Sequence, residues 1–186
     1  MFPYAEKHKA GLEYAAFLDR YATPEQRIRW DRVFSEVRIT DQQQSLLQSF
    51  VRDMPILALV GAWCGDCVNQ CPIWERFAQV TPRIQVRYFD RDEHPDLAAE
   101  LSTCGAARVP AVAFLSEDGH LCGRYGDRTL SKYRRIMSSQ GGAACPTGLA
   151  TPQSELEDVT QDWLNEFERI QAMLRTSGRL RQLHGD

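Results

Sequence analysis

The stretch of sequence that decides the fold is Ile56-Leu57-Ala58-Leu59-Val60-Gly61-Ala62-Trp63-Cys64-Gly65-Asp66-Cys67. Its opening residues, 56–60, form an unbroken apolar run, which is typical of a strand that is buried on both faces. After the second cysteine, apolar residues recur at helical spacing, at Val68, Cys71, Trp74, Phe77 and Ala78. The two cysteines therefore lie where a buried strand passes into a helix.

This position gives the cysteine pair its expected chemistry. A thiol must ionise before it attacks a disulfide, and the unpaired N–H groups and the dipole at a helix N-terminus favour the thiolate. Cys64 lies at that end of the predicted helix, and Cys67 follows within one turn, close enough to form a disulfide with it. We therefore expect Cys64 to be the nucleophile and Cys67 to resolve the mixed disulfide with a substrate.

A pair of cysteines at this spacing also occurs as half of a zinc site. Cys71 extends the pair along the helix. It is either a third exchanging thiol, a third metal ligand or a small apolar residue on the buried face, and we favour the last. A zinc site needs a fourth ligand, and Cys104 or His94 could serve only if folding brought them near. We therefore predict no metal site.

The rest of the chain predicts an α/β core with helices at both ends. Thr23 with Gln26, and Thr40 with Gln43, have the spacing of capping boxes, which begin helices. Apolar periodicity predicts helices over 14–21, 95–101 and 130–137, strands over 84–88, 111–115 and 121–125, and a hairpin turn at 117–119. The apolar stripe of the helix that begins at Thr40 continues to Met54. Residues 37–39, before this helix, could instead form a short strand.

These elements suggest an organisation in four parts. We expect a helical N-terminal arm at 1–40, an α/β domain at 41–140, a Gly-rich linker at 141–152 and an amphipathic helix at 153–186 that packs on the core. Docking is favoured for the last helix because an exposed stripe with Trp163 and Phe167 would be a liability. A dimer interface or a partner site is the alternative.

Composition narrows the class of protein. The chain has 186 residues, 43% of them hydrophobic, with a net charge of -3 and a pI near 5.8. These values suit one domain with a normal core and give no basic footprint for nucleic acid or a membrane surface. Because the N-terminus lacks a secretory pattern, we expect a cytoplasmic protein, in which six cysteines serve redox chemistry or packing instead of a disulfide framework.

The sequence resembles the thioredoxin family over roughly residues 41–140. The resemblance rests on Trp63-Cys64-Gly65-x-Cys67 and on matching residues further along, namely Pro72, Asp92, Pro95, Val109, Pro110 and Gly126. It implies a thioredoxin-like α/β fold, with a central mixed sheet flanked by helices. It further implies a cis bond before Pro110, a substrate groove bounded by Gly126, backbone hydrogen bonds from Val109 to an extended substrate, and shielding of the sulfurs by Trp63.

The function that the resemblance implies is reduction, or less readily oxidation, of disulfides in protein partners. This chemistry needs no metal or organic cofactor, but it needs an electron donor that the sequence does not identify. We expect a monomer or a weak homodimer. The alternatives are a redox-sensing or protein-binding module of the same fold without efficient turnover, and a metal-binding protein that uses Cys64, Cys67 and Cys71.

The sequence departs from the family pattern at two positions. The family buries an aspartate where this chain has Ala58, and it has a proline between the cysteines where this chain has Asp66. Asp66 is either a proton acceptor for Cys67, in place of the missing acid, or a solvated residue of the first helical turn, and the two readings are equally favoured. Its charge would repel a Cys64 thiolate about 6 Å away by roughly 0.7 to 3 kcal/mol, depending on the local dielectric.

The remaining candidates have no motif spacing. We expect Cys104 to pack in the core, Cys122 has no assigned role, and Cys145 in the linker is the extra thiol most exposed to oxidants. Arg108 beside the proline loop could favour a thiolate at Cys64 or contact an acidic substrate, although an ordinary solvated arginine is the favoured interpretation.

Overall fold

The computed structural model describes residues 2–140 and 154–186, and its centre is a mixed four-stranded sheet. Strand β1 (Met54–Val60) pairs in parallel with β2 (Ile84–Asp90) and antiparallel with β3 (Ala111–Leu115). Strand β4 (Leu121–Gly126) continues β3 as an antiparallel hairpin, giving the order β2-β1-β3-β4. The sheet confirms the expected thioredoxin-like α/β class.

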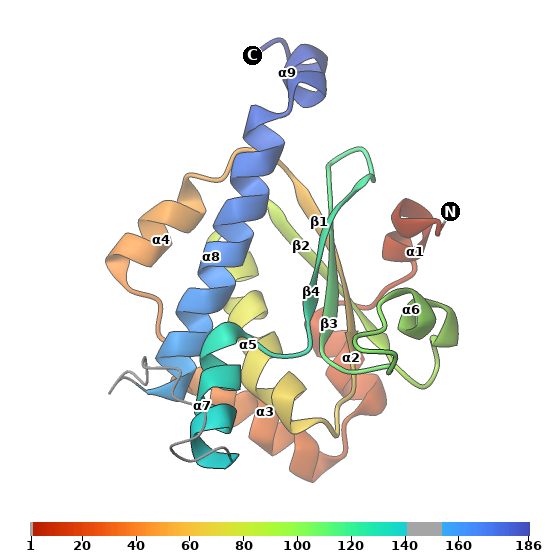
Figure 1. The fold of residues 1–186 in the computed structure, drawn as a ribbon, viewed down its shortest axis with the longest axis vertical. Coiled ribbons are helices and arrows are strands. Elements are labelled where there is room, and N and C mark those ends of the chain that lie inside the picture. Colours follow the sequence, from red (N-terminus) through yellow and green to blue (C-terminus); the bar gives the residue numbers. More distant parts are fainter. Residues whose placement is uncertain (1, 141–153) are drawn as a thin grey trace.

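Helices cover both faces of the sheet and also form the N-terminal and C-terminal parts of the chain. They are α1 (Tyr4–Lys9), α2 (Tyr14–Tyr21), α3 (Pro24–Glu36), α4 (Asp41–Gln48), α5 (Gly65–Val80), α6 (Pro95–Glu100), α7 (Leu130–Gln140), α8 (Glu155–Thr176) and α9 (Gly178–His184). Figure 1 shows α5 and α8 on one side of the sheet and α1 and α6 on the other. The apolar run that predicted a strand buried on both faces is therefore the interior of a three-layer structure, and residues 56–60 are fully buried.

The N-terminal helices begin where the capping boxes predict. The Thr23 and Thr40 side chains accept hydrogen bonds from the backbone N–H groups of Gln26 and Gln43. In turn, the glutamine side chains accept hydrogen bonds from the backbone N–H groups of Thr23 and Thr40. The predicted stripe as far as Met54 is wrong, because α4 ends at Gln48 and Met54 begins β1. Pro55 explains the change, since a residue before proline avoids the helical conformation.

The alternative strand at 37–39 is also absent from the structure, where these residues have no regular secondary structure. Val37 is the C-cap of α3 and is completely buried. Its burial explains the apolar pattern without a strand.

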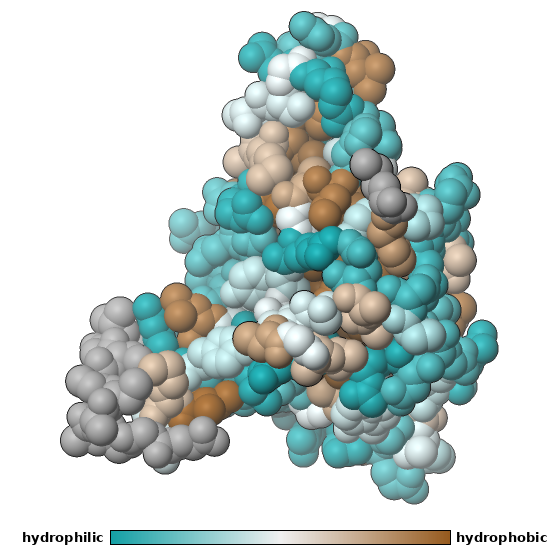
Figure 2. Space-filling model, turned by 45° about the vertical axis from the view of Figure 1, so that its right-hand side comes forward, coloured by the Kyte–Doolittle hydropathy of each residue, from teal (hydrophilic) through white to brown (hydrophobic). Residues whose placement is uncertain are grey.

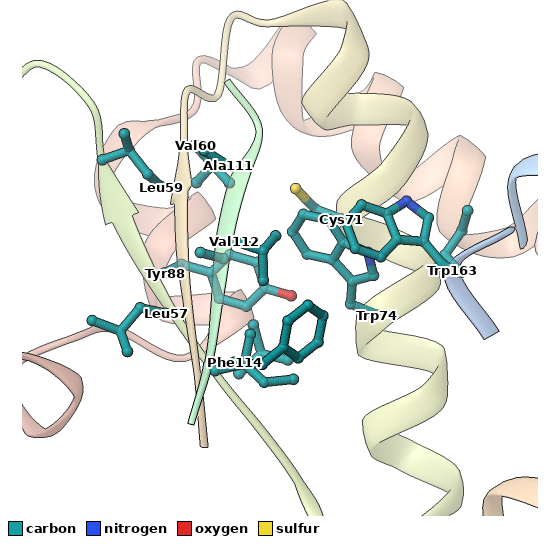
Figure 3. Packing of buried hydrophobic residues seen from close by; sticks show 14 of the residues in the cluster. Leu57, Leu59, Val60, Cys71, Trp74, Tyr88, Ala111, Val112, Phe114 and Trp163 are labelled. Atoms are coloured by element: carbon teal, nitrogen blue, oxygen red, sulfur yellow. The ribbon is translucent and has the colours of Figure 1, made fainter. Parts of the chain in front are cut away.

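The C-terminal segment packs on the face of the sheet that carries α5. The fully buried Trp163 lies with its ring centre 4.7 Å from that of Trp74 on α5, and Phe167 contacts Phe77 and Phe114 at centre distances of 5.4 and 5.3 Å. Figure 3 shows Trp163 and Trp74 side by side at the edge of the buried cluster. These contacts join α8 to both the sheet and the helix that carries the cysteines.

The expected single helix at 153–186 is in fact two helices. The helix breaks at Ser177, whose backbone is extended (φ -65°, ψ 114°), and the Ser177 side chain accepts a hydrogen bond from Leu180 N, so that it caps α9. Serine followed by Gly178 favours such a break, because serine is a good N-cap and glycine weakens a continuous helix. The predicted linker at 141–152, with Cys145, lies outside the described residues.

Hydrophilic residues cover most of the face shown in Figure 2, and hydrophobic residues form separate patches, one of them near the end that carries α9. Leu183 on α9 is 65% exposed. Among the described helices, none is long and apolar enough to cross a membrane.

Candidate active site

Cys64 lies at the junction between β1 and α5. It is the N-cap residue of α5, with an extended backbone, and its Sγ accepts a hydrogen bond from the backbone N–H of Cys67 at 3.4 Å. Cys67 lies in the first turn of the helix and is completely buried, whereas 9% of the Cys64 surface remains exposed. Of the two sulfurs, Cys64 is therefore the one that an external disulfide can approach.

A second loop faces the Cys64 sulfur. The Val109–Pro110 peptide bond is cis, and the Cys64 thiol donates a hydrogen bond to the Val109 carbonyl oxygen at 3.4 Å. Gly126, at the end of β4, pairs with Ala111 directly after this loop. A Cβ atom at Gly126 would lie only 2.5 Å from the Pro110 oxygen, and its φ of +144° also favours glycine. The fold thus brings Cys64, Val109, Pro110 and Gly126 together.

Trp63 lies at the surface beside the nucleophile and is 46% exposed. The absence of a side chain at Gly61 makes room for the indole, because a Cβ there would lie 2.7 Å from the ring. The Arg91 guanidinium covers the ring at 4.6 Å from its centre, within the range of a cation–π contact. Trp63 is therefore held in place on the surface between the backbone of its own loop and a cation.

Asp66 is not the solvated residue that one interpretation expected. Its Oδ2 accepts a hydrogen bond from Arg128 Nε at 2.8 Å and forms an ion pair with Arg128 Nη2 at 2.8 Å, and only 18% of its side chain is exposed. The guanidinium offsets the repulsion that the carboxylate would otherwise exert on a thiolate at Cys64. The role of Asp66 as a proton acceptor stays a prediction.

Opposing effects act on the thiols. The Cys67 side chain and burial raise the pKa of the Cys64 thiol, and together they outweigh the backbone N–H groups of Cys67 and Asp66, which lower it. Burial likewise raises the pKa of Cys67. These effects favour the protonated form of Cys64, which is the form that donates to the Val109 oxygen.

A polar network that the sequence did not predict surrounds Asp127, directly after β4. Its buried carboxylate accepts hydrogen bonds from Tyr133 and from Arg108, the latter at 3.2 Å. Burial opposes ionisation, but these donors outweigh it and hold the pKa of the Asp127 carboxyl below its ordinary value. Arg108 is thus ion-paired and not simply solvated.

The same loop is tied to α5 and α8. The Gln70 side chain on α5 donates to the Asp127 carbonyl oxygen at 3.1 Å, and it accepts the indole N–H of Trp163 at 2.9 Å. Both Gln70 and Trp163 are buried. A helix remote in sequence therefore fixes the loop that carries Asp127 and Arg128.

The N-terminal arm holds the other side of the site. The indole of Trp30 on α3 donates to the Ala62 carbonyl oxygen at 2.9 Å, two residues before Cys64. Trp30 is completely buried. The fold thus places its indole N–H group against the backbone of the cysteine loop.

The other cysteines are distributed differently from one another. Cys71 is completely buried, which confirms its interpretation as a small residue on the inner face of the helix, and Figure 3 shows it within the core cluster. The expectation that Cys104 packs in the core is wrong, since it is exposed and has a positive φ of 50° in a turn. Cys122 is half-buried. Within residues 2–140 and 154–186, no group of three or more candidate ligands could hold a metal ion.

Comparison with known proteins relates this arrangement to a family. A sequence model described as thioredoxin (Thioredoxin_9) matches residues 11–139, well over half of the chain. The chain belongs to the thioredoxin family. Its membership, together with the closely spaced Cys64 and Cys67, supports a redox function.

Two solved structures resemble this thioredoxin-family protein over nine-tenths or more of its length, and a third matches half of it. PA1234, a protein of unknown function from Pseudomonas aeruginosa, is 18% identical, with a TM-score of 0.72 over 91% of this chain and 97% of that chain. An HIV epitope-scaffold, 4E10, is 17% identical, with a TM-score of 0.62 over 100% and 99% of the two chains. Oxidized mitochondrial thioredoxin 3 from Saccharomyces cerevisiae is 24% identical, with a TM-score of 0.34 over 50% and 86%. No curated protein sequence matches the chain. The first two likenesses show the shared fold.

This thioredoxin-family protein differs from the expected pattern in its buried polar groups. Ala58 on β1 lies opposite Tyr88 on β2, whose hydroxyl is buried and has no hydrogen-bond partner among the described residues. The strand β2 runs to Asp90, two residues beyond the predicted strand at 84–88. The Asp90 carboxylate binds the N–H groups of Asp92 and Glu93, at 2.9 and 3.3 Å, and so closes the turn after the strand.

Proposed function

We propose that this protein is a cytoplasmic thiol–disulfide oxidoreductase that reduces disulfides in protein partners. The observation that carries the proposal is the placement of Cys64. It caps α5, faces the Val109 carbonyl next to the cis Pro110, and has the buried Cys67 one turn behind it. An accessible thiol with a second thiol directly behind it suits a reaction in two exchange steps.

In the first step the Cys64 thiolate attacks a substrate disulfide. A bond forms between Cys64 Sγ and one substrate sulfur, while the other substrate sulfur leaves as a thiolate and takes up a proton. In the second step Cys67 loses its proton and attacks Cys64 Sγ, which releases the second substrate thiol and leaves a Cys64–Cys67 disulfide. A dithiol donor then reduces that disulfide, so two electrons pass from donor to substrate per cycle.

The groove residues have separate roles in this proposal. The Val109 carbonyl accepts a hydrogen bond from the Cys64 thiol in the resting protein. Once the thiol ionises, this carbonyl becomes free to pair with an extended substrate. Trp63 covers the flank of the site, and Gly126 allows the end of β4 to lie against the backbone of Pro110, where a side chain would clash. The charge of Asp66 is offset by its ion pair with Arg128, so that its repulsion of the Cys64 thiolate is reduced.

Reduction of insulin disulfides, with dithiothreitol as the electron donor, tests the proposal. We expect Cys64→Ser to abolish the catalysed rate and Cys67→Ser to accumulate a mixed disulfide with the substrate. Cys104→Ser, which removes an exposed thiol, is the matched control and should retain the wild-type rate. Wild-type activity in the Cys64→Ser variant would contradict the proposed nucleophile.

A second candidate is a redox sensor or protein-binding module that exchanges its disulfide without efficient turnover. The burial of both thiols favours it, because burial raises the pKa of each and disfavours the reactive thiolate. The number of insulin disulfides reduced per protein molecule separates the two functions. Many turnovers support the oxidoreductase, whereas a stoichiometric reaction that stops after one disulfide supports the sensor.

A further inference from the structure

The surface beside the nucleophile is a pocket with a volume of about 480 Å³. Its lining includes Trp63, Cys64 and Asp66 from the cysteine loop and α5, Arg29 and Arg32 from α3, and Lys132 from α7. This volume lies in the range of small-molecule sites. A group bound to Cys64 would therefore lie next to three cationic side chains.

Two of the charges in this pocket are already balanced. Asp66 forms its ion pair with Arg128, and Lys132 pairs with Glu155 at the start of α8. The only acidic side chain in the described lining is thus neutralised by a cation outside it. The unbalanced positive charge of the pocket therefore comes from the arginines of α3.

Arg29 and Arg32 supply an excess of positive charge. Among the described residues, Arg29 has no ion-pair partner, and Arg32 has only Glu36 at 4.0 Å, with both of these side chains more than half exposed. Such a distant, exposed pair holds an arginine weakly, so both guanidinium groups are free to bind an anion.

The helix that carries the two arginines is fixed relative to Cys64. They are three residues apart and so lie on one face of α3, next to the buried Trp30 and Val33. Trp30 in turn donates to Ala62 in the cysteine loop. The helix that carries the free charges is therefore bonded to the loop that carries the nucleophile.

We propose that the preferred substrates of this site are anionic disulfides, which carry a carboxylate close to the sulfur that bonds to Cys64. The proposal rests on the oxidoreductase function above and names its substrate class. Arg29 and Arg32 bind the carboxylate while Cys64 attacks the sulfur, and they favour approach of an anionic over a cationic disulfide.

Three small disulfides of similar size and different charge provide the test: dithiodipropionate (anionic), 2-hydroxyethyl disulfide (neutral) and cystamine (cationic). Each kcat/KM is divided by the rate at which the same disulfide reacts with a small neutral thiol, which removes intrinsic reactivity. We expect the corrected value to be about tenfold higher for the anionic than for the cationic disulfide at low salt, and the difference to shrink as salt rises.

The double variant R29E/R32E should abolish or invert this preference, mainly through KM. R38E/R175E is the matched control, because it makes the same change in net charge at exposed arginines that do not line the pocket, and it should keep the wild-type preference. The milder R29Q/R32Q pair covers the case in which the charge reversals fail to fold.

The outcomes separate this inference from the function on which it rests. Equal corrected rates for the three disulfides, or a preference that survives R29E/R32E, would overturn the charge selectivity and leave the oxidoreductase function standing. Reduction of insulin but of none of the three small disulfides would also overturn the charge selectivity alone, whereas no reduction of insulin or of any of the three by wild-type protein would overturn both.

Discussion

Two buried tryptophans hold the redox site from opposite ends of the chain, and they do so in different ways. Trp30 on α3 donates its indole N–H directly to the backbone of the cysteine loop, at Ala62. Trp163 on α8 donates to the Gln70 side chain, which in turn holds the Asp127 carbonyl. The first contact positions the nucleophile, and the second positions the loop that carries Arg128.

Their surroundings differ as well. Trp30 lies among aromatic rings of the N-terminal arm, with Tyr14 and Phe17 at centre distances of 5.8 and 6.2 Å. Trp163 contacts Trp74 and Tyr125, at 4.7 and 4.9 Å, and so joins α5 to β4. The two extensions therefore belong to the architecture of the site, and each tryptophan allows packing and positioning to be separated by mutation.

The largest expected effect comes from deleting either indole. Trp30→Ala and Trp163→Ala each leave a large cavity in a fully buried position, and each should lower the free energy of unfolding by about 3–5 kcal/mol. Urea denaturation measures this loss. A loss below about 1 kcal/mol at either position would show that the extension it belongs to is not part of the cooperative core.

Phenylalanine at the same positions separates the hydrogen bond from the packing. Trp30→Phe and Trp163→Phe should each cost about 1–3 kcal/mol, because a buried acceptor loses its donor. Only Trp30→Phe is expected to slow disulfide exchange at Cys64, by about tenfold, since small displacements of reacting groups have large effects on rate. Equal effects of the two variants on exchange would remove the proposed difference between the anchors.

The loop held through Trp163 predicts a dependence on pH. Because the folded pKa of Asp127 lies below the ordinary value of about 3.9, its contribution to stability is present above that pH and is lost as the pH falls through the folded pKa. Asp127→Asn should cost about 1 kcal/mol at pH 7 and should flatten the fall in stability below pH 4. Chemical denaturation between pH 2 and 7 measures both, and parallel curves for the two proteins would contradict the prediction.

The smallest expected effect concerns the ion pair at the end of the same loop. Asp66→Asn should change stability by less than about 1 kcal/mol, because the pair is partly exposed. Arg128→Gln should slow alkylation of Cys64 by iodoacetamide, since it leaves the Asp66 carboxylate unpaired beside the thiol. The double variant should recover the rate of Asp66→Asn, and additive effects of the two substitutions would show that the residues are not coupled.

Much of the fold could be predicted from local patterns. The apolar run at 56–60 and the capping residues Thr23 and Thr40 predicted a buried strand and two helix starts, because these signals act over a few residues. Ser177 followed by Gly178 carries the same kind of local signal, a helix cap, but the longer apolar periodicity predicted one helix across it. The prediction that Cys104 is buried was wrong for a different reason, because no local pattern separates a buried cysteine from one in an exposed turn.

The sequence by itself determined that Cys64 would lie at the N-terminus of a helix with Cys67 one turn behind it. It could do so because strand burial, helix periodicity and capping are properties of neighbouring residues. Only the tertiary structure decided what surrounds that pair: the ion pair of Asp66 with Arg128, the hydrogen bond from Trp30 to Ala62, and the free arginines of α3. The two contacts join residues 32 and 62 positions apart, and the arginines come from a separate helix, so their partners are set by how the layers pack and not by any periodicity along the chain.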